Sequence, residues 1–217
     1  MFISHYGIAF GAKAAAPETS LGSLLLAALF PDLLWATLLL LGVERVQLAS
    51  DATKGSPLIF EYYPFSHSLL LTVIWGIVFA GVYFAVRRYL RGAIVMGLAV
   101  VSHWLLDFIV HQPDLPLLPA GKLVGLSLWS STSGTILLEM AIFLLGLGLY
   151  FNQTIAMDEV DWRVGFLILL IIGGYFWPLF GPPPSSVTNV ILTAQAQWLL
   201  VALGYWADWR RVSKYYL

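Results

Sequence analysis

The sequence predicts an all-α fold: a polytopic membrane helical bundle of about six transmembrane helices plus an N-terminal half-helix. Three observations favour this class. Hydrophobic residues make up 59% of the 217 residues and charged residues only 11%, which leaves too little polar surface to cover a soluble globule. Several apolar runs reach the ~20 residues that a helix needs to cross a bilayer. The basic residues cluster at the ends of these runs, as in loops that stay in the cytoplasm.

The first element is the half-helix, residues 2–16, which is rich in small residues and ends at the Pro17–Ser20 turn. Ser20 is a suitable N-cap for the first full span. Pro31 interrupts the middle of that span, where a proline removes one backbone hydrogen bond and bends the helix. The expected spans are 21–43, 67–86, 92–110, 135–150, 164–180 and 187–206.

The segments between the spans are loops and turns. Residues 44–64 form a polar loop, after which Ser66 is the expected N-cap of the second span. Residues 87–91 form a tight basic turn, and residues 112–134 form a loop rich in proline and serine. We expect one integral membrane domain over residues 1–217, in which residues 1–150 carry the functional groups and helices 164–207 support them.

The lysines and arginines predict the orientation in the membrane. If the 87–91 turn is cytoplasmic, most of the remaining basic residues fall on the same side, namely Lys13, Arg163, Arg210, Arg211 and Lys214. Only Arg45, Lys54 and Lys122 fall outside. The sequence therefore predicts a multi-pass protein whose C-terminus is cytoplasmic. The net charge of −1 provides no basic surface for nucleic acid.

A polar stripe ends the third span. His103, Asp107 and His111 are spaced four residues apart, so they share one helix face. In a soluble helix a His-x-x-x-Asp pair such as His103 and Asp107 often does no more than form a hydrogen bond along the helix. An ionisable side chain at bilayer depth costs roughly 2.5–3.5 kcal/mol even on lenient insertion scales, so in a membrane span it usually marks function.

Four further ionisable groups are expected near this stripe, His5 and Asp32 close to mid-depth and His67 and Glu139 toward the outer face. If residues 3–15 fold back antiparallel against 20–33, His5 lies beside Asp32. His67 falls in the first turn of the second span, where hydrogen bonding to backbone is the alternative role. Glu139 falls in the first turn of the fourth span, where a carboxylate also favours the helix dipole. Under the predicted orientation these groups gather in the outer half of the membrane.

This constellation indicates a metal site. Cysteine is absent, which leaves imidazole and carboxylate as the strong ligands. The candidate ligands are His5, Asp32, His67, His103 and Asp107, a set that suits one or two zinc ions, or manganese or iron. Asp107 is the candidate bridge between two ions, and the serines at 4, 66 and 102 are candidate outer-shell partners. A Ser–His catalytic pair is disfavoured because adjacent residues on a helix point apart.

The same residues carry a resemblance. The series His5, Pro31-Asp32, Ser66-His67-Ser68 and Ser102-His103-x-x-x-Asp107 resembles a bacterial family of membrane-bound metal-dependent hydrolases, whose best-named branch is described as LexA-binding and inner-membrane-associated. The match covers about the first half of the chain. It implies a hydrolase in the bacterial inner membrane and no particular substrate.

The ligand order His, Asp, His, His-x-x-x-Asp is also similar to the zinc-dependent phospholipase C and P1-type nuclease family, which is all-α and cleaves phosphodiesters. This similarity implies two metal ions surrounded by the five candidate ligands, with Asp107 shared. The chain departs from that family because it lacks an N-terminal tryptophan and a second His-x-x-x-Glu pair. Only His111 and Glu139 remain for a third ion.

The leading hypothesis is a metal-dependent hydrolase acting on a lipid or lipid-linked phosphoester in the outer half of the bilayer. Its candidate catalytic residues are Asp107, Glu139 and His111. The first alternative is a metal-ion or proton transporter, since intramembrane acids and histidines also serve relays. The second is a non-enzymatic scaffold in which the polar cluster only holds helices together. The substrate, the metal, the oligomeric state and catalysis itself stay open.

Overall fold

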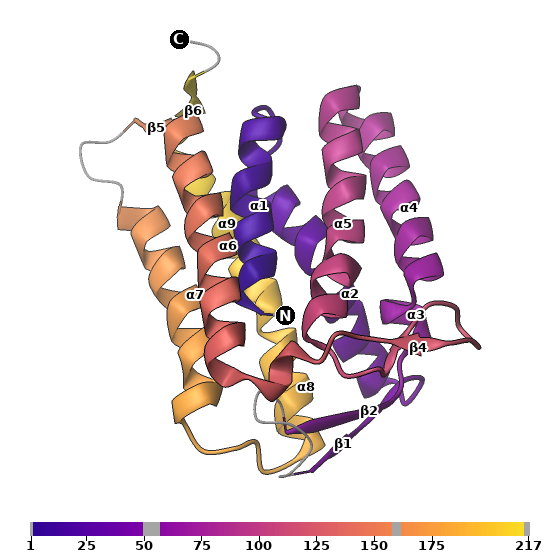
Figure 1. The fold of residues 1–217 in the computed structure, drawn as a ribbon. Coiled ribbons are helices and arrows are strands. Elements are labelled where there is room, and N and C mark those ends of the chain that lie inside the picture. The colour runs from indigo at the N-terminus through magenta and orange to yellow at the C-terminus, as the bar shows by residue number, and fades with distance from the viewer. Residues whose placement is uncertain (1, 50–56, 158–161, 215–217) are drawn as a thin grey trace.

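The computed structural model describes residues 2–49, 57–157 and 162–214 as a helical bundle with short antiparallel strand pairs at its two ends (Figure 1). The helices are α1 (Ile3–Ala15), α2 (Leu21–Leu40), α3 (Pro64–His67), α4 (Leu69–Arg87), α5 (Leu90–Val110), α6 (Thr132–Gln153), α7 (Trp162–Phe180), α8 (Val187–Gln195) and α9 (Gln197–Asp208). The antiparallel strand pairs are β1 (Arg45–Leu48) with β2 (Leu58–Tyr62), β3 (Leu115–Pro116) with β4 (Leu123–Val124), and β5 (Thr154–Ala156) with β6 (Arg211–Ser213).

The predicted fold class is confirmed. Within the described residues, six helical segments are long and apolar enough to cross a membrane, and the last of them runs through α8 and α9 from Val187 to Asp208. Large apolar side chains cover the outside of the bundle, as in Leu137 on α6 and Trp177 on α7. This surface is compatible with a multi-pass membrane protein.

Helix α1 forms the centre of the bundle, between α6 on one side and α5 on the other, with α2 behind it (Figure 1). Two glycines allow the close approach of α1 to α6. A Cβ atom added at Gly7 would lie 2.7 Å from the Ile142 carbonyl oxygen, and one at Gly146 would overlap the Gly7 carbonyl oxygen. This contact seats the short helix and therefore fixes the position of His5.

The predicted start of the second span is wrong. Its N-cap is Ser68, whose hydroxyl accepts a hydrogen bond from the Leu71 amide, and not Ser66. Ser68 has an extended backbone, which separates α4 from the one-turn helix α3. His67 therefore ends α3 and does not lie in the first turn of α4. This break lets Pro64, at the first position of α3, start a turn of its own.

Two other boundaries differ from the prediction. Helix α6 begins at Thr132 because Ser131 caps it, which places Glu139 about two turns inside the helix and not in its first turn. The sixth span breaks at Ala196, between α8 and α9. The loops predicted at 44–64 and 112–134 contain the β1–β2 and β3–β4 hairpins, and Lys54 lies outside the described residues.

A buried ion pair fastens the end of the bundle that carries β5 and β6. Lys13 Nζ lies 2.6 Å from Asp208 Oδ2 and also donates to the Thr19 carbonyl oxygen. The Asp208 carboxylate accepts from the Leu21 amide and the Tyr150 hydroxyl, both at 2.9 Å. The α1–α2 turn, α6 and α9 thus meet at one polar cluster in which both buried charges are paired and hydrogen-bonded. Either charge left unpaired at this depth would destabilise the fold.

We predict that Gly146→Ala destabilises the protein by about 1–3 kcal/mol, because the added methyl group forces α6 away from the Gly7 backbone. Gly148→Ala is the matched control, since a Cβ there meets nothing within 4 Å. Thermal unfolding in detergent, followed by circular dichroism, measures both. Equal melting temperatures for the two variants would contradict this account of the α1–α6 contact.

Candidate metal centre

Four helices bring the five predicted ligands together inside the bundle. α1 supplies His5, α2 supplies Asp32, α3 supplies His67, and α5 supplies both His103 and Asp107. They form two groups of three that share His103, and the ligand atoms of each group lie within 4.8 Å of one another. The side chain of Asp32 is 20% exposed and the other four are 5% exposed or less, so Asp32 marks the open edge of the cluster.

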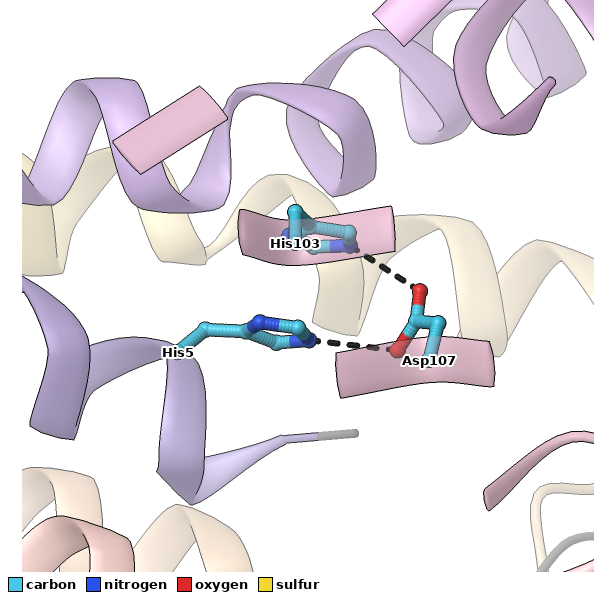
Figure 2. Close-up of side chains that lie close together, drawn as sticks. All are labelled: His5, His103 and Asp107. Carbon is cyan, nitrogen blue, oxygen red and sulfur yellow. Dashed lines mark ion pairs between the residues drawn. The ribbon is translucent and has the colours of Figure 1, made fainter. Parts of the chain in front are cut away.

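Asp107 lies between the imidazoles. Its Oδ1 lies 3.3 Å from His5 Nε2, and its Oδ2 lies 3.2 Å from His103 Nε2 (Figure 2). His67 Nε2 also approaches Oδ2, at 3.6 Å. The rings of His5 and His103 are stacked, with centroids 3.7 Å apart and planes 3° apart, so both point a nitrogen toward the same carboxylate. Asp107 therefore lies within 3.6 Å of all three imidazoles, although the residue common to both groups of three is His103, and the predicted bridging role of Asp107 stays a prediction.

Asp32 completes the second group. Its Oδ1 lies 3.5 Å from Nε2 of both His67 and His103. The predicted fold-back of the N-terminal helix does bring His5 and Asp32 into one cluster. The carboxylate that His5 approaches at 3.3 Å is, however, Asp107.

The hydrogen bond at the far side of His103 fixes its tautomer. Nδ1 lies 2.8 Å from the Ala28 carbonyl oxygen, which only accepts hydrogen bonds, so Nδ1 carries the proton. A neutral His103 then directs the lone pair of Nε2 at Asp32 and Asp107. Within the described part of the chain, Nε2 of His103 and of His5 are buried without a partner in hydrogen-bond geometry. Such orphaned buried nitrogens are what a metal ion satisfies.

The donor set fits a divalent metal. Imidazole nitrogen and carboxylate oxygen are ligands of zinc, manganese and iron, and each group of three leaves further coordination positions open. Neutral imidazole nitrogens and carboxylate oxygens that converge at 3.2–3.6 Å repel one another unless a proton or a metal cation lies between them. The residues present therefore fit a divalent metal, whose two positive charges would balance both carboxylates.

Neither ligand group of the described structure includes Glu139 or His111, the other two predicted catalytic residues. The Glu139 carboxylate accepts hydrogen bonds from the amides of Phe2 and Ile3, both at 2.9 Å. It therefore caps the first turn of α1, where a negative charge is favoured. Glu139 holds the helix that carries His5, and a catalytic role for it stays a prediction.

His111 continues the predicted stripe but lies beyond the last turn of α5, as its C-cap. Its Nδ1 lies 2.9 Å from Asp114 Oδ1, and its ring packs against Trp129 and Phe60 with centroids 4.3 and 4.9 Å away. Burial lowers the pKa of His111 and favours the neutral ring. A catalytic role for His111 also stays a prediction.

Sequence reasoning missed Glu44. It named Ser66 both as a candidate outer-shell partner and as the N-cap of the second span, and the N-cap assignment is wrong. Glu44 is buried although it lies in the predicted polar loop, and its carboxylate accepts a hydrogen bond from Ser66 Oγ at 2.6 Å. Ser66 Oγ in turn lies 2.7 Å from His67 Nδ1, so these adjacent residues do meet. No spacing in the sequence signals a contact between positions 44 and 66.

Comparison with protein-family models, with curated proteins and with solved structures finds no match for this chain.

We predict that Asp107→Asn removes bound metal but keeps the fold, because the substitution preserves size and removes the shared charged ligand. The loss of affinity should exceed the ~10–100-fold that removal of an outer-shell partner causes. Asp114→Asn is the control, since that carboxylate contacts His111 and lies outside both ligand groups. Elemental analysis and the melting temperature measure the two effects.

A purely structural role of Asp107 predicts the opposite result for Asp107→Asn. If Asp107 only satisfies His103 along the helix, asparagine still accepts that hydrogen bond. Removing a buried charge would then be neutral or stabilising. An Asp107→Asn protein with unchanged metal content and a raised melting temperature would show that the cluster is structural.

Proposed function

We propose that this protein is a membrane-embedded, metal-dependent hydrolase that acts on a lipid or lipid-linked phosphoester. The observation that carries the proposal is the convergence of three imidazoles on two carboxylates, with two buried Nε2 atoms that lack hydrogen-bond partners in the described chain. Zinc is the metal favoured by the donor set, as one or two ions, with manganese or iron as the other candidates.

Each residue has a role in this proposal. His5, His103 and Asp107 hold one position for an ion, and Asp32 and His67 complete a second position beside His103. Bound there, divalent metal would activate water and neutralise charge on a phosphoryl oxygen. Asp32 is the most exposed of the five side chains, so substrate is expected to approach from its side of the cluster.

Two features support a lipid substrate. The ligands lie among helices long and apolar enough to cross a membrane, a place that a water-soluble substrate has little reason to enter. An apolar groove of about 340 Å³ also runs along α1 between α5 and α6. Its lining includes Gly7 and Ser102, which are close neighbours in sequence of His5 and His103. A groove of this composition suits an acyl chain, and none of the five candidate ligands lines it.

The charge distribution supports an orientation. The end of the bundle with β5 and β6 carries the 87–91 turn together with Lys13, Arg163 and Arg211, whereas Arg45 and Lys122 lie at the end with the β1–β2 and β3–β4 hairpins. The positive-inside rule places the first end in the cytoplasm. His103 and Asp107 lie in the half of α5 that points to the other end, which corresponds to the outer half of a bacterial inner membrane.

We predict that the metal-loaded protein, reconstituted in vesicles of phosphatidylethanolamine and phosphatidylglycerol, uses water to split the lipid into diacylglycerol and a phosphorylated head group in equal amounts. Asp107→Asn and chelator-treated protein should show only the background rate. Mass spectrometry of the lipids measures the products, and a lipid-linked diphosphate is the second substrate to test.

Uptake of zinc into the same sealed vesicles provides the discriminating measurement. Zinc flux without lipid turnover would replace the hydrolase with a transporter. Metal-loaded protein that shows neither turnover nor flux would support the scaffold alternative and contradict the proposal.

A further inference from the structure

A chain of buried polar groups extends from His67 away from the candidate ligands. Ser66 Oγ lies 2.7 Å from His67 Nδ1 and 2.6 Å from Glu44 Oε2. The other oxygen of Glu44, Oε1, accepts hydrogen bonds from the amides of Phe65 at 2.8 Å and Ser66 at 3.0 Å. Glu44, Ser66 and His67 are 2%, 0% and 4% exposed, so water does not compete for these bonds.

Counting protons determines the direction of each bond. An ionised Glu44 only accepts, so the single hydroxyl proton of Ser66 goes to Glu44 Oε2. Ser66 Oγ therefore accepts from His67, and Nδ1 of His67 carries a proton. A neutral His67 with its proton on Nδ1 has a lone pair on Nε2, the atom that lies 3.5 Å from Asp32 and 3.6 Å from Asp107.

We infer that Glu44 is a positioning residue of the metal centre, which acts through Ser66 to hold His67 in the tautomer that binds metal. The inference deepens the proposed function, since it rests on a metal site at this cluster. Outer-shell carboxylates commonly fix metal-binding histidines, but here a serine hydroxyl lies between the two groups. Glu44 reaches this position because Gly42, with φ of 70°, turns the chain sharply after α2.

The backbone contacts of Glu44 predict what its amide analogue would do. In Glu44→Gln, the carbonyl oxygen remains the acceptor for the two backbone amides, which places the amide nitrogen opposite Ser66 Oγ. That nitrogen donates to Ser66, whose own proton can then go to His67 Nδ1 at 2.7 Å or to the Tyr63 carbonyl oxygen at 3.4 Å, and the shorter contact favours His67. The proton of His67 moves to Nε2, and Nε2 loses the lone pair that a metal requires. Glu44→Gln thus keeps the size of the side chain and its hydrogen bonds to the α3 backbone, but reverses the direction of the hydrogen bonds from residue 44 through Ser66 to His67.

The test compares Glu44→Gln with Glu61→Gln, an equivalent change at an exposed position on the neighbouring strand β2. Nitrogen-15 NMR of the metal-free protein reports the tautomer of each ring, and only four histidines need assignment. We expect His67 to carry its proton on Nδ1 in the wild type and in Glu61→Gln, and on Nε2 in Glu44→Gln. Competition with a zinc chelator should show an affinity lower by ~10–100-fold in Glu44→Gln alone.

Ser66→Ala provides a second variant that keeps both backbone bonds of Glu44. It should weaken zinc binding by about 10-fold. Adding Glu44→Gln to it should cause no further loss, because without the Ser66 hydroxyl no hydrogen bonds link residue 44 to His67. If Glu44 only caps α3, Glu44→Gln leaves the His67 tautomer and the zinc affinity unchanged, and the inference is overturned. Wild-type protein that binds no zinc refutes the proposed metal site, whereas the tautomers of the metal-free proteins still decide whether the relay exists.

Discussion

The structure depends on one electrostatic constraint: imidazole nitrogens and carboxylate oxygens meet in the interior of an apolar bundle, where a proton or a metal cation must balance their lone pairs and charges. His103 is the clearest case, because its Nδ1 proton is bound to a backbone carbonyl and its Nε2 lies 3.2 Å from a carboxylate oxygen of Asp107 without hydrogen-bond geometry. Burying such groups is costly unless a cation compensates them. The close packing of α1, the cap that Glu139 supplies and the relay through Ser66 are understandable as devices that hold these groups in place.

The two ends of the bundle satisfy buried charge in different ways. At the end with β5 and β6, Asp208 is neutralised by Lys13 and receives two further hydrogen bonds, so this cluster is complete. At the end with the β1–β2 and β3–β4 hairpins, Asp32 faces the Nε2 atoms of two histidines. The ion pair between Lys13 and Asp208 holds α1 against α9. Imidazoles and carboxylates at the spacing seen around Asp32 are, in addition, groups that can bind metal. The same fold thus combines a structural lock with a centre suited to chemistry.

Much of this arrangement could be predicted from the sequence, because hydropathy and helix spacing are local signals. The apolar runs gave the spans, the four-residue spacing placed His103 and Asp107 on one face, and the Pro17–Ser20 turn brought His5 into the cluster of Asp32. Interactions between segments distant in sequence were not predictable. Glu139 caps α1 across 136 residues, and Glu44 binds Ser66 across 22. The break between α3 and α4 at Ser68 was not predictable either, because Ser66 and Ser68 both precede an apolar run and each suits an N-cap.

X-ray absorption spectroscopy combined with elemental analysis of the wild-type protein tests the central claim most directly. The protein should be purified without chelators and then equilibrated with zinc. The account predicts at least one tightly bound metal ion per chain, with a first shell of nitrogen and oxygen ligands at about 2.0–2.2 Å. His103→Ala should lose that shell, since this residue belongs to both ligand groups. Protein that retains well under one equivalent of any transition metal after equilibration would contradict the account.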